Sequence, residues 1–425
     1  MTLNSYLFGN SLWKLEFRPP IQIMQISFDN TQHAFEYKSD SELKKAKFLF
    51  SSMGIGWLVK IGTRLTPFAI KAHFPIKNLL RNTIFKQFVG GETLEETQQV
   101  ANKLQHYHVD VILDYGVEGK EGEENFEHAT NEFIKVIEYA ASQKNIPFIS
   151  VKLTGCARFS LLEKLNNCIN NDEAVRGLIN TSTLTVVEKE EWNKVVKRAE
   201  RICVAASKGK VGVLIDAEES WIQQPVDALT MQMMQQYNKE EAIVYNTMQL
   251  YRHDRLNFMK ETIREGIENN FIPAVKIVRG AYMDKERKRA EANNYPSPIQ
   301  PNKAATDSDY NQAIEYCIEK IESVRLIVAS HNEYSNLYTT QLLSVKTIDT
   351  THPHVHFSQL YGMSDNITFN LAKAGFSVSK YLPFGPINDV IPYLMRRAQE
   401  NSSVSGQTGR ELGLIVKELK RRSKN

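Results

Sequence analysis

Short apolar runs alternate with long amphipathic segments from about residue 106 onward. Such runs are typical of strands buried on both faces, and the segments between them have the period of surface helices. The runs cover residues 109–115, 147–153, 211–216, 242–249, 274–278, 325–330, 354–361 and 377–382. Eight strands that alternate with helices over roughly 270 residues match a closed barrel. We therefore predict an α/β fold, a TIM-type (β/α)₈ barrel. A doubly wound sheet is the alternative, but no run is followed by a GxGxxG turn.

Residues 1–105 contain helix-like segments at 41–59 and 93–107, but no ladder of strand-like runs. Residues 39–42 and 91–93 are predicted helix starts, because serine, threonine and aspartate side chains cap the first amide groups of a helix. We predict an N-terminal helical region over residues 1–105 and a barrel over residues 106–425 that carries the active site.

Polar or small residues directly follow the apolar runs. In a (β/α)₈ barrel the active site forms at the carboxyl ends of the strands, so these residues are the candidates for a common site. They are Lys152, Thr154, Asp216, Ala217, Glu218, Gln249, Arg279, Gly280, Ala281, Tyr282, Ser330, His331, Asn332, Gln359, Leu360, Tyr361 and Tyr381.

The stretch 380–401 reads as a short buried strand, a Gly-Pro turn and a helix. We expect Asn388 or Asp389 to cap this helix. It carries two adjacent arginines, and Arg396 is four residues from Glu400, with which it can pair across one turn. Two fixed guanidinium groups at a strand-helix junction suit a small carboxylate, because each offers planar bidentate donors.

The candidates at the other strand ends extend this chemistry. Lys152 adds a third cation, and Asp216 could keep that lysine charged and oriented. Gln249, His331 and Asn332 offer donors and acceptors of the kind that read a heteroaromatic ring edge or a phosphate. Together they predict a site for an anion and a flat cofactor with polar edges.

Composition excludes several other classes. The 52 basic and 49 acidic residues nearly balance, so the whole chain offers no case for nucleic-acid binding. The four cysteines lack metal-ligand spacing and are expected to be free thiols in a reducing compartment. His352, His354 and His356 alternate, but no carboxylate or cysteine lies nearby, so a metal site is disfavoured. Without a spanning apolar run or a secretory signal at residues 1–18, we expect a cytoplasmic protein.

Several motifs occur in the order found in one known family. They are Val151–Gly155 (VKLTG), Leu214–Glu218 (LIDAE), Asn246–Gln249 (NTMQ), Lys276–Tyr282 (KIVRGAY), Ala329–Asn332 (ASHN), Gln359–Met363 (QLYGM) and the stretch from Tyr381 to Glu400. Over about residues 110–410 the chain resembles the proline dehydrogenase family, flavoenzymes built on a distorted (β/α)₈ barrel.

The resemblance implies noncovalent FAD at the strand ends, with L-proline stacked against its ring. Lys152, Arg396 and Arg397 would bind the proline carboxylate, and Tyr282, Leu360 and Tyr381 would wall the pocket. Asp216 and Lys276 would lie near the reacting edge of the flavin as catalytic groups. The implied cofactor-binding residues are Ala217, Gln249, Arg279, Gly280, Ala281, Ser330, His331, Asn332 and Glu400, the last bracing the arginine helix.

The implied reaction is the first step of proline catabolism. Hydride transfer from proline C5 to FAD N5 yields Δ1-pyrroline-5-carboxylate, which a separate dehydrogenase would oxidise further. The electrons would pass to a membrane quinone, and the basic end, residues 417–424, could contact an anionic membrane surface.

Two positions depart from bacterial members. Lys276 stands where many of them have arginine, and Met283 where bifunctional members have tryptophan. Lacking an aldehyde-dehydrogenase-like domain, the chain resembles a monofunctional enzyme.

Two functions of other classes stay open. One is a Schiff-base aldolase that uses Lys152 as its nucleophile, although a neighbouring Asp216 would oppose the neutral amine that this requires. The other is a ligand-binding barrel without catalytic activity. Within the family, the bulk of Tyr381 favours proline over hydroxyproline, because it would crowd a 4-hydroxyl group.

Overall fold

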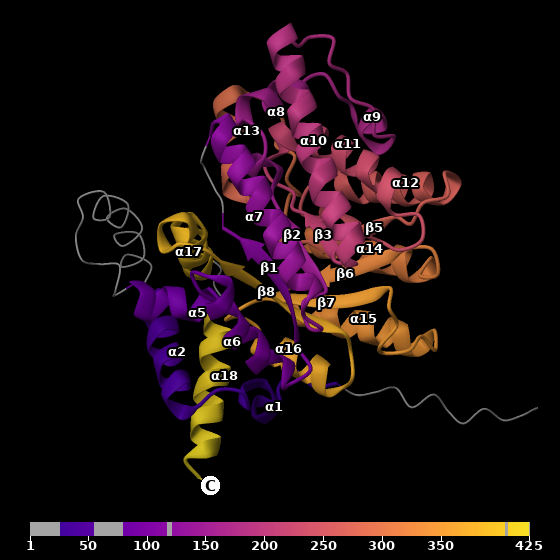
Figure 1. Cartoon of the computed structure of the whole chain (residues 1–425). Helices are drawn as coiled ribbons and strands as arrows, with labels where there is room; N and C mark the ends of the chain where they lie inside the picture. The colour runs from indigo at the N-terminus through magenta and orange to yellow at the C-terminus, as the bar shows by residue number, and fades with distance from the viewer. Residues whose placement is uncertain (1–25, 55–79, 117–120, 404–406, 425) are drawn as a thin grey trace, which may run out of the picture.

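The computed structural model describes residues 26–54, 80–116, 121–403 and 407–424. Its centre is a closed barrel of eight parallel strands in chain order (Figure 1). The strands are β1 (Asp110–Tyr115), β2 (Phe148–Val151), β3 (Gly212–Ile215), β4 (Val244–Gln249), β5 (Ala274–Val278), β6 (Arg325–Ala329), β7 (Val355–Leu360) and β8 (Val378–Phe384). The predicted barrel is confirmed, and each strand ends within two residues of its predicted bounds.

Side chains alternate between the barrel interior and the helix layer, because successive residues of a strand point to opposite faces. Ile112, Leu214, Tyr245, Ala274 and Ile327 form a buried cluster inside the barrel. Two positions further toward the carboxyl ends, four of these five strands carry a polar residue above the apolar cluster: Asp114, Asp216, Thr247 and Lys276. A solid interior with a polar rim is the usual arrangement for a site at the strand ends.

Helices surround the barrel, and most of them connect one strand to the next. These are α7 (Glu123–Ala141), η2 (Leu153–Gly155), α8 (Phe159–Asn166), α9 (Asn171–Val175), α10 (Val186–Gly209), α11 (Ser220–Tyr237), α12 (Arg255–Glu268), α13 (Met283–Asn293), α14 (Lys303–Glu319), α15 (Glu333–Val345) and α16 (Asp365–Lys373). Within the described part of the chain, no helix is both long and apolar enough to cross a bilayer.

The remaining helices cover one flank of the barrel (Figure 1). They are α1 (Thr31–Phe35), α2 (Asp40–Met53), η1 (Arg81–Phe85), α5 (Lys86–Phe88), α6 (Leu94–Gln105), α17 (Ile387–Ser403) and α18 (Gln407–Arg422). Apart from α6, all of them contribute buried residues to a second apolar core. The N-terminal helices are thus held to the C-terminal helices by burial of apolar surface. The domain division at residue 105 stays a prediction.

The predicted helix starts are confirmed. Ser39 caps α2 in a capping box with Glu42, and the Thr93 side chain accepts from the amide of Glu96 at the start of α6. The predicted end of the first helix, residue 59, lies outside the described residues. The predicted cap of α17 is wrong, because the helix begins at Ile387, before Asn388 and Asp389. The Pro386 carbonyl accepts from the amide of Asp389 at 2.8 Å, and the Glu92 carboxylate accepts from the amide of Ile387 at 3.3 Å.

Gly362 fixes the N-terminal helices to the carboxyl end of the barrel. Its φ is +80°, and a Cβ at this position would lie 2.0 Å from the carbonyl oxygen of Gln87. The Gln87 side-chain amide donates to the carbonyl of Gly362 at 2.7 Å. Only glycine allows this approach, because any side chain would collide with the backbone of α5.

A buried ion pair ties α11 to α12 behind the barrel. The Arg255 guanidinium and the Asp227 carboxylate are at most 1% exposed, and their N and O atoms lie 2.6 Å apart. Asp227 also accepts from the side chains of Gln223 and Asn246. Removing one partner of such a pair leaves an uncompensated buried charge.

We therefore expect Asp227→Ala to lower the free energy of unfolding by about 3–5 kcal/mol, measured by denaturant titration. Arg264→Ala is the control, because this arginine is 61% exposed in its ion pair with Glu261; its effect should stay within about 0.5 kcal/mol. A loss below about 1 kcal/mol in Asp227→Ala would contradict a stabilising role for the pair.

Candidate active site

Asp216 is the centre of a charged network at the carboxyl mouth of the barrel. It directly follows β3, where its amide donates to the carbonyl of Val151 at 2.9 Å. Its carboxylate accepts from the ammonium of Lys276 on β5 and, at 2.7 Å, from the hydroxyl of Tyr381 on β8. Burial by itself would raise the pKa of Asp216, but Lys276, Lys152 and the Tyr381 hydroxyl outweigh it and lower the pKa below its ordinary value. Asp216 is therefore ionised at neutral pH.

Lys152 joins the same network from the end of β2. Its ammonium lies 4.0 Å from the carboxylate of Asp114, and it is close enough to Asp216 to favour that residue's ionised form. The prediction that Asp216 orients Lys152 is therefore compatible with their positions, but Asp114 shares the role. Sequence reasoning missed Asp114 because it lies inside an apolar run. It stands two residues after Ile112 on β1 and therefore faces the same side of the strand, which is the pattern that could have identified it.

Tyr381 and Leu360 form one wall of the mouth. They are register partners on β8 and β7, and the Tyr381 carbonyl accepts from the amide of Tyr361 at 2.9 Å. The Lys276 ammonium lies 5.4 Å from the centre of the Tyr381 ring. The ring is therefore held by a hydrogen bond at its hydroxyl and a cation at its face.

Tyr282 and Arg396 reach the mouth from outside the strands. Burial raises the pKa of the Tyr282 hydroxyl well above its ordinary value, while Lys152 and Arg396 act in the opposite direction because both lie near it. On α17, the Arg397 guanidinium stacks 5.4 Å from the ring centre of Tyr393. The structure thus brings Lys152 and Arg396 to the same region, as predicted. The side chain of Glu400, which was expected to brace them, lies outside the description.

Arg279 is fixed on all sides at the end of β5. It donates to the hydroxyls of Ser330 and Ser335 at 2.7 Å each, and its Nε lies 3.2 Å from Asp307. Its guanidinium carbon lies 3.7 Å from the ring centre of Tyr310. Arg279 and Ser330, both predicted flavin contacts, are thus preorganised by the protein itself.

The other predicted flavin contacts differ in how many hydrogen bonds they already make within the protein. Gln249 donates to the carbonyl of Glu218 at 2.7 Å, and Asn332 caps α15 by accepting from the amide of Ser335 at 3.0 Å. A Cβ at Gly280 would lie 2.4 Å from the sulfur of Met283, so this glycine first serves packing within the chain. Ala217, next to Asp216, is partly exposed. Ala281, next to Tyr282, is largely exposed.

His331 is neutral in this environment. Surrounding protein atoms, with Lys380 and Arg397, lower its pKa to about 3, and its Nδ1 lies 2.8 Å from the hydroxyl of Ser364. A neutral imidazole donates at one nitrogen and accepts at the other, and the Ser364 hydroxyl can serve Nδ1 in either role, so the contact fixes the position of the ring.

Thr247 carries a polar group that needs a partner. Its side-chain oxygen is buried and has no hydrogen-bond partner within the described chain. Thr247 pairs in register with Lys276, so both side chains face the barrel interior. Buried hydroxyls are normally bonded, so the position fits a polar ligand edge held against β4 and β5.

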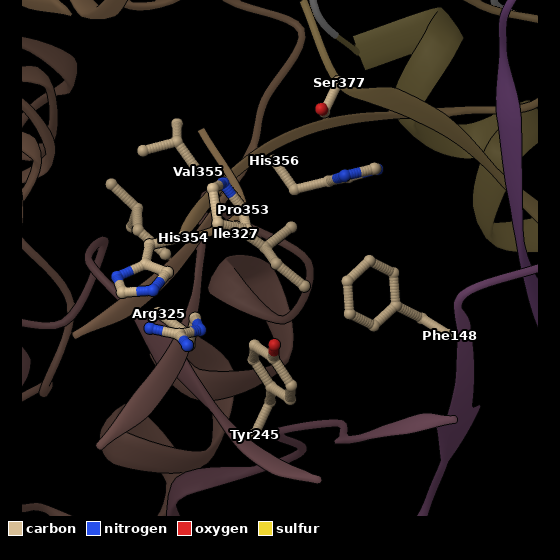
Figure 2. Close-up of a pocket in the computed structure, with 10 residues that line it drawn as sticks. Phe148, Tyr245, Arg325, Ile327, Pro353, His354, Val355, His356 and Ser377 are labelled. Carbon is tan, nitrogen blue, oxygen red and sulfur yellow. The ribbon is translucent and has the colours of Figure 1, made fainter. Parts of the chain in front are cut away.

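The opposite end of the barrel holds a small cavity of about 50 Å³ (Figure 2). It is lined by residues at the amino ends of the strands, among them Phe148, Tyr245, Arg325 and His356. His356 contacts the hydroxyl of Ser379, whereas His354 faces the carbonyl of Ile321 at 2.5 Å. The rings of His352 and His354 lie 4.7 Å apart, but His356 has a different partner, so the three histidines do not share one site. No group of three or more metal-ligating side chains was found among the residues the structure describes.

Comparison with known proteins agrees with this geometry. The family model described as proline dehydrogenase matches residues 97–410. The chain belongs to the proline dehydrogenase family. It is 34% identical over 379 residues to the mitochondrial proline dehydrogenase 1 of Dictyostelium discoideum, which covers 82% of this chain and 66% of that protein. It is 30% identical over 414 residues to the hydroxyproline dehydrogenase of Xenopus laevis, covering 91% and 88%.

Solved structures share the fold of this chain. The proline utilization A protein of Bdellovibrio bacteriovorus superposes with a TM-score of 0.67 at 19% identity, over 92% of this chain and 42% of that one. The chain thus spans less than half of this larger protein and about two thirds of the Dictyostelium relative. Membership of the proline dehydrogenase family implies a flavin cofactor, and the polar rim with its unpaired Thr247 hydroxyl fits one.

The Lys276–Asp216 pair gives a test that does not depend on activity. Without Lys276, burial should raise the pKa of Asp216 above its unfolded value of about 3.9, so the folded state gains stability as the pH falls through the raised pKa. We expect Lys276→Met to cost about 2–3 kcal/mol of unfolding free energy at pH 7, less than a fully stranded buried charge because Lys152 remains, and to recover part of it at pH 5.

Denaturant titration at both pH values measures this. Lys276→Arg keeps the charge and should lack the recovery, and Lys276→Met combined with Asp216→Asn should abolish it. A loss in Lys276→Met that is equal at pH 7 and pH 5 would argue against Asp216 as the partner.

Proposed function

We propose that this chain oxidises L-proline to Δ1-pyrroline-5-carboxylate with FAD as its cofactor, the first step of proline catabolism. The proposal rests on one observation above others. In a member of the proline dehydrogenase family, the barrel mouth holds an ionised Asp216 bonded to Lys276 and Tyr381, with Lys152 beside it.

The cationic side chains would bind the substrate carboxylate. Lys152 comes from a strand end, whereas Arg396 and Arg397 come from α17, so the carboxylate would be held between the barrel and the helix. Guanidinium groups give planar bidentate contacts, and the ammonium adds a point charge. Fixing the carboxylate in this way fixes the orientation of the ring C5–H bond and removes orientational entropy from the reaction step.

The flavin would be held by residues at the strand ends, which are Gln249, Lys276, Arg279, Ser330 and His331. Thr247 offers a further hydroxyl that has no partner among the described residues. Bound FAD supplies the hydride acceptor for the C5 hydrogen of proline. Asp216, with its lowered pKa, is a weak base. Asp216 would keep Lys276 and Lys152 charged and hold the hydroxyl of Tyr381 in place. The group that accepts the proton of the substrate amine is not assigned.

We further propose a quinone as electron acceptor and a separate dehydrogenase that consumes the product, both supported by the family alone. We also propose membrane contact through the basic C-terminal end, although its two arginines are paired within the protein. Arg422 bonds to Asp40 and to the carbonyls of Phe35 and Lys38, and Arg421 pairs with Glu418. These two arginines pack against the protein itself, whereas Lys417, Lys420 and Lys424 of the same end are exposed.

Two rival functions are weaker. A Schiff-base aldolase needs a neutral Lys152, but the Asp114 carboxylate 4.0 Å away favours the charged ammonium. A barrel that only binds its ligand would not need so many fixed charges at the strand ends. Hydroxyproline as substrate is the closer alternative, because one relative carries that name.

The visible spectrum of the purified protein tests the function directly. We expect flavin absorption that bleaches on anaerobic addition of proline. Arg396→Met and Arg397→Met should each raise the KM for proline, and the Ki of carboxylate analogues, about tenfold to a hundredfold, the loss of one charge-assisted clamp of about 1.5–3 kcal/mol.

Both variants should retain flavin, and Arg264→Met, at an exposed position of α12, is the matched control. Unchanged KM and Ki in both arginine variants would contradict the assignment of Arg396 and Arg397 to carboxylate binding. A colourless protein that borohydride traps with a keto acid would favour the aldolase, and flavin that proline never bleaches would favour a binding protein.

Tyr381 gives the test of substrate choice. We expect Tyr381→Ser to raise the KM for proline and to narrow its preference over 4-hydroxyproline, because the ring no longer fills the space beside C4. Tyr381→Phe is the control: it keeps the ring but removes the 2.7 Å bond to Asp216. Steady-state kinetics with both substrates decides it. Parallel changes for the two substrates in Tyr381→Ser would mean that Tyr381 supports the fold and does not select the ligand.

A further inference from the structure

Ser364 occupies an unusual backbone conformation between the barrel and the C-terminal helices. It lies just before α16 with φ +50° and ψ 42°, in the left-handed region that residues with a side chain rarely adopt. It is 3% exposed. A strained, buried, non-glycine residue persists only where its surroundings hold it in place.

The amide and the hydroxyl of Ser364 both have partners from distant segments. Its amide donates at 2.5 Å to the carboxylate of Glu411 on α18, and its hydroxyl lies 2.8 Å from Nδ1 of His331, which follows β6. Glu411 thus holds the backbone of Ser364, and Ser364 in turn holds the imidazole. The contacts link the C-terminal helix to a residue at the carboxyl mouth of the barrel.

Glu411 is itself buried in a charged cluster. It is 4% exposed. Burial and the neighbouring carboxylate of Asp365 raise the pKa of Glu411 to about 7, whereas the Ser364 amide, Lys380 on β8 and Lys38 just before α2 act in the opposite direction. Asp365 is bonded to Lys38 at 2.8 Å and paired with Lys380 at 3.0 Å. The carboxyl of Glu411 therefore changes its charge near neutral pH.

The imidazole, in contrast, does not titrate in that range. With a pKa of about 3, His331 stays neutral from pH 5 to pH 9. Its chemistry at the barrel mouth then depends on the orientation of the ring, which the partner of Nδ1 holds. Ser364 is that partner.

We propose that Ser364 and Glu411 are positioning residues for the flavin site, with ionised Glu411 fixing Ser364, and Ser364 fixing the imidazole of His331 for contact with FAD. This inference rests on the proposed function, because it assumes that His331 contacts the cofactor.

The contact between Glu411 and Ser364 predicts in which direction the affinity for FAD changes with pH. An ionised carboxylate is a stronger acceptor for the Ser364 amide than a protonated one. FAD should therefore bind more tightly above pH 7 than below it. By reciprocity, FAD binding should lower the pKa of Glu411 and release a fraction of a proton near neutral pH.

The test is the FAD dissociation constant of the full chain at pH 6.0 and pH 8.5, measured by flavin fluorescence, with proton release measured by calorimetry in two buffers. Wild type should bind about fivefold more tightly at pH 8.5. Glu411→Gln should lose the step and bind at both pH values as wild type does at pH 6.0. Ser364→Ala should raise the dissociation constant about tenfold at both.

Two further variants separate positioning from folding. Ser364→Gly adopts the left-handed conformation without strain but lacks the hydroxyl, so it should match Ser364→Ala. Glu418→Gln alters a buried carboxylate on the same α18 that pairs with Arg421 and Arg422. It should keep the pH step, even if the protein melts earlier.

The outcomes distinguish the two proposals. Wild type that binds FAD equally at both pH values, or Ser364→Gly with wild-type affinity, overturns the positioning role while leaving the proposed function intact. Loss of the step in Glu418→Gln as well would also overturn it, because the docking of α18 alone would then explain the effect. Wild type that binds no FAD at either pH overturns the proposed function and this inference with it.

Discussion

The carboxylate of Asp216 is the constraint on which the barrel mouth depends. A charge taken out of water needs partners close by, or it becomes protonated. Here the partners come from three other strand ends: Lys276, Tyr381 and Lys152. Satisfying one buried charge therefore fixes the relative positions of β2, β3, β5 and β8, and it leaves cations and a tyrosine ring directed at the same space.

Helices outside the repeating unit complete this mouth. The arginines lie on α17, which is held by an apolar core shared with α1, α2, α5 and α18. Gly362 presses the N-terminal segment against the end of the barrel, and Glu411 extends from α18 to Ser364. The carboxylate clamp therefore depends on packing between the two ends of the chain as well as on the barrel.

Many polar residues at the mouth bond first to the protein. Arg279 is held by two serines, an aspartate and a tyrosine ring, and Asn332 caps a helix. Such bonds orient a side chain before any ligand arrives, which lowers the entropy lost on binding. Thr247, with its hydroxyl unbonded, is a different case, and it marks where a ligand would contribute most.

The sequence by itself determined the eight strands, their order, and the residues that end them, because burial on both faces leaves continuous apolar runs and parallel strands place their carboxyl ends together. It also identified most of the site through motifs. Only the tertiary structure decided which residues pair: Asp114 and Thr247 are inside apolar runs, and the Lys276–Asp216 bond joins residues sixty positions apart. The cap of α17 was misjudged because the first amide of the helix, that of Ile387, donates to the side chain of Glu92, far away in the sequence. Such contacts depend on strand register and on the packing of distant helices, which no local pattern encodes.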